Sequence, residues 1–211
     1  CFDNEVKVIP QGGNTNLVAS ASPSTEKREI IINMEKMNLI HHVDTINKCV
    51  EVDAGVVIDD LNSTLEKQDF LFPLEMASTG SSQVGGIIST NAGGINVLHY
   101  GSVRNNLLAL DVVLSNGRIL RLGSKVVKDN TGYNLKDLFC GSEGTLGIIT
   151  KAILKIYPKS QNYFTFIASF ENLKNLINFY EHISKEFRFP ITGFEMIPQI
   201  SFDLCIKHNF M

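Results

Sequence analysis

The sequence lacks several features that identify common classes of protein. Tryptophan is absent, charged residues make up 19% of the chain, and no apolar run approaches the length of a membrane-spanning helix. The net charge of −3 provides no general attraction to nucleic acid or to an anionic membrane surface. A chain of 211 residues with this composition is expected to form one large domain or about one and a half typical ones.

Paired cysteines are also missing. The four cysteines, at positions 1, 49, 140 and 205, are widely spaced, and no C-x-x-C occurs. The spacing therefore predicts neither a zinc knuckle nor a thioredoxin-like motif, and it favours reduced thiols in a cytosolic protein. The five histidines show no spacing typical of metal ligands, so no metal site is predicted.

Formal charge is absent from residues 76–103, between Glu75 and Arg104. This stretch contains QVGGIISTNAGG, and it includes the second of three small-residue loops, which are expected at residues 11–16, 80–94 and 141–147. Because glycine has no Cβ, its N–H can approach a ligand closely, and successive free N–H groups form a concave site for an anion such as a diphosphate. The residues alone leave a second interpretation open, in which these glycines serve only tight turns. Neither a P-loop motif nor a G-x-G-x-x-G after the first strand is present.

Hydrophobic periodicity predicts a mixture of strands and helices. Strands are expected at 5–9 (ended by Pro10), 29–32 (buried), 48–54, 148–156, 163–170 and 191–196. Helices are expected at 57–69 and 171–187, where apolar residues follow three-and-four spacing. The Asn-Gly pair at 116–117 lies between two apolar runs, 105–114 and 118–122, which is typical of a β-hairpin. The β-α-β pattern after Pro158 indicates the beginning of a second domain.

Five segments of the chain resemble, in the same order, the FAD-linked D-2-hydroxy-acid dehydrogenase family. They are VIPQGGNTNL, GGIISTNAGG, HYGSVRNNLLALDVVLSNGRIL, KDNTGYNLKDLFCGSEGTLGIIT and ITGFEMI. The resemblance runs from about Val6 to about Ile197. It is nearest to the D-2-hydroxyglutarate dehydrogenase branch, with D-lactate dehydrogenase and the glycolate oxidase flavin subunit as relatives.

The resemblance implies an α+β fold of the vanillyl-alcohol-oxidase (PCMH) type. Residues 1–158 would form the FAD-binding domain of two α+β subdomains, with its N-terminal part missing. Residues 159–211 would begin a ferredoxin-like cap that binds substrate, and we expect the chain to be truncated. In the family this cap supplies the substrate-binding cations, the acid–base histidine and the metal ligands. The resemblance therefore implies no catalytic or metal residue in this chain, and any metal would bind in the missing cap.

The resemblance also implies which residues hold the cofactor. The diphosphate of FAD would lie against the first loop, at Gln11, Gly12, Gly13, Asn14, Thr15 and Asn16. The flavin and its ribityl chain would be lined by Ser81, Ser82, Gly85, Gly86, Thr90, Asn91 and Ala92. The third loop would bring Glu143, Gly144, Gly147 and Ile149 near the cofactor. No histidine or cysteine matches a flavin attachment point, so the FAD is expected to be non-covalent.

The activity implied by the resemblance is oxidation of a D-2-hydroxy acid, such as D-2-hydroxyglutarate, D-lactate or glycolate, to the 2-oxo acid. The Cα hydride would pass to flavin N5, and an acceptor such as electron-transfer flavoprotein or a quinone would then take the electrons. A homodimer, and a location in the cytoplasm or in the mitochondrial matrix of a eukaryote, are further expectations. Two alternatives stay open: a truncated, inactive FAD-binding module, and an oxidase that acts on a different alcohol.

Three positions depart from the family pattern. Asn16 stands where glycine is usual, Asn134 stands where aspartate is usual, and the segment VASASPS replaces a frequent glycine pair. Asparagine tolerates left-handed backbone better than most residues, so the turn at Asn16 can survive. Arg104 and Lys128 are the nearest candidates for binding a substrate carboxylate, and both are expected to be structural or solvent-facing instead.

Overall fold

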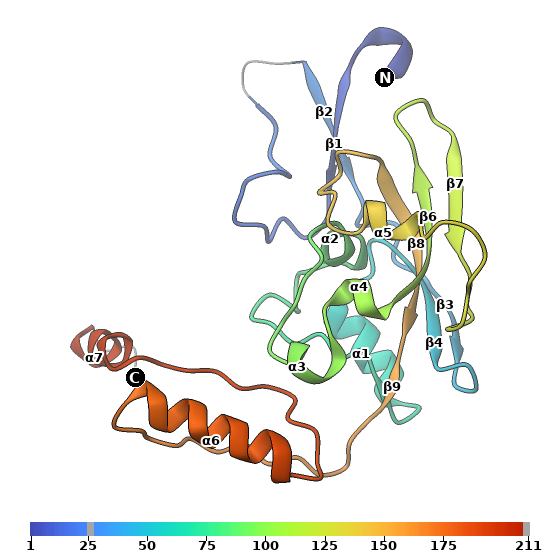
Figure 1. Cartoon of the computed structure of the whole chain (residues 1–211). Coiled ribbons are helices and arrows are strands. Elements are labelled where there is room, and N and C mark those ends of the chain that lie inside the picture. The colour runs from blue at the N-terminus through green and yellow to red at the C-terminus, as the bar shows by residue number, and fades with distance from the viewer. Residues whose placement is uncertain (25–27, 209–211) are drawn as a thin grey trace.

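A computed structural model describes residues 1–24 and 28–208 of the chain (Figure 1). At the centre of this described part lies a five-stranded antiparallel sheet with the strand order β3-β4-β8-β6-β7. Its strands are β3 (Ile40–Asp44), β4 (Cys49–Asp53), β6 (Leu107–Val113), β7 (Ile119–Gly123) and β8 (Ile148–Lys155). The sheet is the platform on which the glycine-rich segments are arranged.

The core lies between this sheet and short helices on one of its faces. Val50 and Val52 of β4 are fully buried against the helical side, together with Leu154 of β8. Between the two valines, Glu51 points to the other face and pairs with Lys151 at 3.0 Å. This alternation follows from the two-residue period of a strand, and it gives the sheet one apolar and one charged face.

Helix α1 (Ile58–Glu66) provides part of the apolar layer. Ile58, Leu61 and Leu65 are its buried residues, at the spacing that places them on one stripe. Asp59 and Asp60 lie in the first turn, where negative charge is favourable at the positive end of the helix dipole. The helix predicted at 57–69 is therefore confirmed, with slightly shorter ends.

The strands predicted at 48–54 and 148–156 correspond to β4 and β8, and the predicted hairpin is formed by β6 and β7. The hairpin loop is closed by Leu114 N–H, which donates to the Arg118 carbonyl at 2.9 Å. Gly117 has a φ of 79°, and it is the residue of this loop that takes the left-handed conformation. Part of the first apolar run forms the short helix α4 (Val103–Asn106) before β6 begins.

A second, two-stranded sheet is formed by β1 (Lys7–Gln11) and β2 (Glu29–Asn33), which run parallel. The prediction that Pro10 ends the first strand is wrong, because Pro10 lies within β1 and is paired in register with Ile32. A strand that has a neighbour on one side only tolerates proline, since the missing N–H can face the unpaired side. The expected burial of β2 is also wrong: Ile32 is 38% exposed, because one neighbouring strand cannot cover both faces.

Several elements were not predicted from the sequence. Helix α2 (Val84–Ser89) lies inside the segment predicted as the loop 80–94, which is a correction. Its first N–H groups donate to residues that follow β4, from Val84 to the Val56 carbonyl at 2.9 Å and from Gly85 to the Ala54 carbonyl at 2.7 Å. The remaining unpredicted elements are η1 (Phe2–Asn4), β3, β5 (Phe70–Leu71), α3 (Val97–Tyr100), α5 (Lys136–Phe139), β9 (Tyr157–Pro158) and α7 (Gln199–Lys207).

The residues after β9 form a separate arm in which α6 (Leu173–Glu186) and α7 lie away from the sheet (Figure 1). Helix α6 confirms the prediction at 171–187, and Asn172 caps it by accepting a hydrogen bond from Asn175 N–H at 2.9 Å. The strands predicted at 163–170 and 191–196 are wrong, because neither segment has a hydrogen-bonded neighbour among the described residues. In that described part, no helix is long and apolar enough to cross a membrane.

Candidate functional site

The first and second glycine-rich segments are in direct contact. A Cβ added to Gly13 would lie 1.8 Å from the Ser81 carbonyl oxygen, so only glycine fits there. Close by, the hydroxyls of Thr15 and Ser82 share a hydrogen bond at 3.1 Å, and Ser82 shares a second with Ser78 at 2.9 Å. These contacts hold the loop after β1 against the turn that leads into α2.

The third glycine-rich segment approaches the same helix from its other end. Gly141 N–H donates to the Ile88 carbonyl at 3.0 Å, and Glu143 N–H donates to the Ser89 carbonyl at 2.9 Å. A Cβ on Gly144 would lie 2.9 Å from Pro10 Cγ, which shows that this loop also touches β1. The three segments predicted from the sequence therefore converge around α2, although they are far apart along the chain.

Each of the three segments contains backbone donors without partners. Within the described part of the chain, no group accepts a hydrogen bond from the backbone N–H of any residue in 12–16, of Gly86 or of Gly144. Asn14, Asn91 and Glu143 have φ values of 53°, 50° and 49°, so each segment contains a non-glycine residue in the left-handed region. Unused N–H groups in left-handed backbone, as at Asn14 and Gly144, are suited to binding an anion without a lysine.

Gln83 is a site residue that sequence reasoning missed. Its side chain is 6% exposed, and its Oε1 atom is buried without a hydrogen-bond partner among the described residues. The amide lies against the first loop, since a Cβ on Gly12 would be 3.1 Å from that oxygen. A buried acceptor without a donor is unfavourable by itself. The signal in the sequence was the amide side chain at the start of QVGGIISTNAGG.

Two neighbouring glycines of α2 face different surroundings. A Cβ on Gly85 would lie 2.9 Å from the Ala54 Cβ, so this glycine allows α2 to pack closely on the chain that follows β4. A Cβ on Gly86 would meet no atom of the described residues within 4 Å, and Gly86 is exposed. The open side of α2 is therefore the side from which a ligand can reach the three loops.

Three predicted site residues are packed into the protein, and the hydroxyl of a fourth, Thr90, is bonded within α2. Ile149 is buried in the core, and a Cβ on Gly147 would lie 2.7 Å from Val112 Cγ1. Ala92 packs at the edge of the core, while Thr90 is exposed and its hydroxyl donates to the Gly86 carbonyl at 3.1 Å. Contact of these four residues with a cofactor stays a prediction, as it does for the other predicted site residues.

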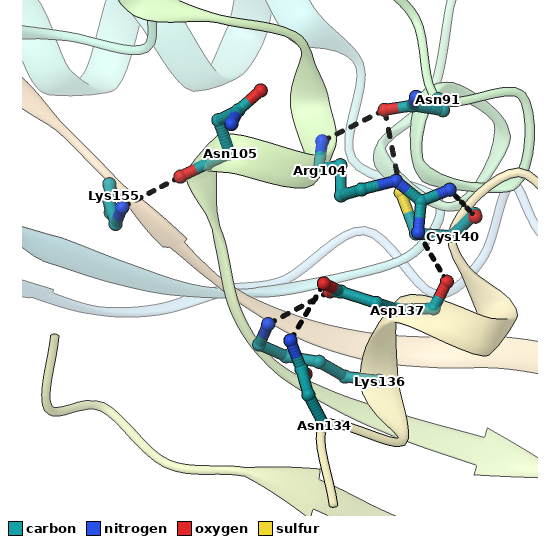
Figure 2. A network of polar contacts seen from close by, with 8 residues as sticks. All are labelled: Asn91, Arg104, Asn105, Asn134, Lys136, Asp137, Cys140 and Lys155. Carbon is teal, nitrogen blue, oxygen red and sulfur yellow. Dashed lines mark hydrogen bonds and ion pairs between the residues drawn. The ribbon is translucent and has the colours of Figure 1, made fainter. Parts of the chain in front are cut away.

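Arg104 is structural, as expected. Its guanidinium donates to the carbonyl oxygens of Asp137 and Cys140, and its backbone N–H donates to Asn91 Oδ1 at 3.0 Å (Figure 2). The Cys140 thiol lies 3.7 Å from the same Asn91 oxygen, and burial raises the pKa of this thiol. Lys128 is exposed, which agrees with its expected place in solvent.

Two cavities of the protein lie away from the three loops. One of about 560 Å³ is lined by residues 38–43 with Thr64 and Gln68, and one of about 310 Å³ lies on the charged face of the sheet near Glu51 and Lys151. Neither of these two cavities is lined by a residue of the three loops. In the described ranges, no group of three or more His, Cys, Asp or Glu residues could hold a metal ion.

Comparison with known proteins places this arrangement in a family. Residues 1–123, more than half of the chain, match the family described as FAD binding domain. The chain belongs to the FAD-binding domain family. The cofactor is therefore FAD, and the flavoprotein family predicted from the sequence is confirmed.

Curated relatives of this FAD-binding chain match it over its whole length. D-2-hydroxyglutarate–pyruvate transhydrogenase DLD3 of Saccharomyces cerevisiae is 39% identical over 222 residues, which cover 100% of this chain and 44% of that protein. The mitochondrial D-2-hydroxyglutarate dehydrogenase of Danio rerio is 39% identical over 211 residues, which cover 99% of this chain and 39% of that protein. The chain thus spans less than half the length of these relatives.

Among solved structures, alkyldihydroxyacetonephosphate synthase resembles this chain with a TM-score of 0.67 and 30% sequence identity. The match covers 76% of this chain and 29% of that one. Together with the mixed α+β architecture and the antiparallel central sheet, it confirms the predicted PCMH-type FAD-binding fold. The division at residue 158 into a FAD-binding domain and a cap stays a prediction.

Proposed function

We propose that this chain is the FAD-binding part of an oxidoreductase that oxidises a D-2-hydroxy acid to the corresponding 2-oxo acid. The observation that carries the proposal is the convergence of three glycine-rich segments on α2, where the backbone N–H groups of residues 12–16, Gly86 and Gly144 are unused. The relatives named for D-2-hydroxyglutarate support the substrate class. D-lactate and glycolate are the further members of that class to be tested.

The residues that fit FAD divide by chemistry. Backbone N–H groups of residues 12–16 are suited to the diphosphate, because successive free donors satisfy an anion without desolvating a side-chain charge. Gln83 Oε1 is suited to accept a hydrogen bond from a hydroxyl of the cofactor, which would remove the cost of its unpartnered state. The open face at Gly86 leaves room for the neutral flavin. FAD held there supplies the acceptor for a hydride from the substrate Cα.

The remaining parts of the proposal concern partners and location. The Arg104 guanidinium is committed to two carbonyl oxygens, so the cation that binds the substrate carboxylate has to come from another part of the protein. We propose a non-covalently bound FAD and an electron acceptor such as electron-transfer flavoprotein or a quinone. A homodimer, and a place in the mitochondrial matrix or the cytoplasm, complete the proposal.

The experiment is an anaerobic titration of the flavin-loaded protein, produced from the complete gene, with D-2-hydroxyglutarate, D-lactate and glycolate. Bleaching of the flavin absorbance by one of these acids, but not by L-2-hydroxyglutarate as the matched control, is expected. A flavin that dithionite reduces but none of the acids reduces would favour an inactive FAD-binding module. Rapid reoxidation by air, without need for another acceptor, would favour an oxidase.

A further inference from the structure

Arg104 joins two of the three glycine-rich segments. It lies directly after the uncharged stretch, within α4. Its side chain reaches α5, which is about 30 residues further along the chain (Figure 2). The two carbonyl oxygens that it contacts belong to Asp137 and Cys140, at the end of α5, where a helix leaves its last carbonyls without helical partners. A planar guanidinium offers two such acceptors a rigid fork of donors, whereas lysine has only a single ammonium group on a flexible stem.

The contacts of Arg104 extend to both loops. Its backbone N–H donates to Asn91 Oδ1 at 3.0 Å, which fixes a residue whose φ is 50° in the second segment. Gly141 follows Cys140 directly, and a Cβ there would lie 3.2 Å from Arg104 Nη2. Glycine at this position therefore lets the guanidinium approach the start of the third segment.

The charge of Arg104 is not neutralised by a carboxylate. Among the described residues no acidic side chain forms an ion pair with its guanidinium. The nearby Asp137 carboxylate instead accepts hydrogen bonds from Lys136 Nζ at 2.9 Å and from Asn134 Nδ2 at 2.7 Å. Arg104 thus acts on the loop through charge-assisted hydrogen bonds to backbone carbonyls, which are stronger than neutral ones.

We propose that Arg104 is a positioning residue for the FAD site. By fixing the Cys140 carbonyl and Asn91 together, it holds Glu143 and Gly144 in their places against α2 and β1, and so it sets the affinity for FAD. This inference rests on the proposed FAD site. Loss of both charge-assisted bonds in Arg104→Met is expected to weaken FAD binding about tenfold to a hundredfold. Arg104→Lys can restore one bond and should give an intermediate affinity.

The test measures loop position and FAD affinity separately, in the 211-residue chain carrying Cys1→Ser and Cys205→Ser. The two remaining thiols, Cys49 and Cys140, are both buried, and burial raises the pKa of each. Labelling by a thiol reagent, located by mass spectrometry, reports the opening of the third segment at Cys140, while Cys49 in β4 is the internal standard. Arg121→Met is the matched control, because Arg121 is exposed on the other face of the sheet.

In Arg104→Met, Cys140 is expected to be labelled at least about tenfold faster than in the wild type, while the labelling rate of Cys49 is unchanged. The affinity for FAD is expected to fall in the order wild type, Arg104→Lys, Arg104→Met. Unchanged FAD affinity in Arg104→Met would overturn the inference, and so would equal acceleration at both thiols, which would indicate global destabilisation. If the wild-type chain binds no FAD, the proposed site fails and the effect on affinity fails with it. Labelling confined to Cys140 would then show that Arg104 still fixes the loop.

Discussion

The fold alone does not explain why the side-chain oxygen of Gln83 is buried without a hydrogen-bond partner among the described residues. This oxygen lies directly beside the first glycine loop. Leaving an acceptor in this state costs about 1–3 kcal/mol, so a protein that keeps it gains something elsewhere. A hydroxyl of FAD is a donor of the required kind, and the gain would then appear only when the cofactor is bound.

Replacement of Gln83 by methionine keeps the length of the side chain and removes the unpartnered oxygen. The free energy of unfolding without FAD should be unchanged or higher by about 1 kcal/mol, while FAD should bind about fivefold to tenfold more weakly. Urea denaturation and a fluorescence titration with FAD measure the two quantities. FAD affinity equal to that of the wild type would show that Gln83 does not contact the cofactor.

Helix α2 is the element on which the proposed FAD site depends. It lies within the second glycine-rich segment, and the first and third segments make contacts at its two ends. Its six residues are too few for a stable isolated helix, so tertiary contacts hold it in place. The hydrogen bonds to the Ala54 and Val56 carbonyls are the main ones. Gly85 and Gly86 are adjacent in this helix, and one faces the core while the other faces the open side.

These two glycines give a matched pair of variants. Gly85→Ala should lower the free energy of unfolding by about 1–3 kcal/mol, because the new methyl group is forced against Ala54. Gly86→Ala should leave it unchanged or raise it by up to about 1 kcal/mol, because alanine favours helix, and yet it should weaken FAD binding by filling the open side. Chemical denaturation and FAD titration check both. A Gly86→Ala variant that binds FAD normally would place the flavin elsewhere.

At this scale the sequence could predict elements whose signal is local, and it could not predict those that depend on distant contacts. The apolar stripe of α1 and the alternation of β4 were sufficient by themselves. Helix α2 was not predictable, because its glycine-rich sequence disfavours helix and its support comes from the residues that follow β4. The segments at 163–170 and 191–196 have the composition of strands, but a strand also requires a hydrogen-bonded neighbour.

The candidate site shows the same division. Its glycine loops were found from the sequence because glycine and a lack of charge are visible in it. Gln83 and Arg104 were not assigned to the site, because an unpartnered oxygen and a pair of bonded carbonyls exist only in the folded chain. Ile149 was assigned to the site only through the resemblance; the structure places it in the core, and its contact with a cofactor stays a prediction.

For the whole molecule, three groups with raised pKa values make stability depend on pH on the alkaline side. Burial raises the pKa of Cys49, Cys140 and Tyr157 above their ordinary values of 9.0 for cysteine and 10.0 for tyrosine. As pH rises, the unfolded chain therefore loses these protons before the folded chain does. The stabilisation that they contribute is complete below the unfolded pKa values and is lost as pH rises towards the folded ones.

The free energy of unfolding should therefore be nearly constant between about pH 7 and 8 and fall above about pH 9. Urea denaturation across this range measures it. The double variant Cys49→Ala, Cys140→Ala should show a shallower decrease, because two of the three groups are removed, although its stability at neutral pH is lower. An unfolding free energy that rises above about pH 9 would contradict the assigned direction of these pKa shifts.

The measurement that tests the central claim most directly is the absorbance spectrum of the purified chain after incubation with FAD and removal of the free cofactor. The account predicts a retained flavin spectrum, in equimolar amount with the chain and released by denaturation, because the three loops around α2 form a non-covalent FAD site. Circular dichroism on the same sample establishes that the chain is folded. A folded chain that retains no flavin would contradict the claim.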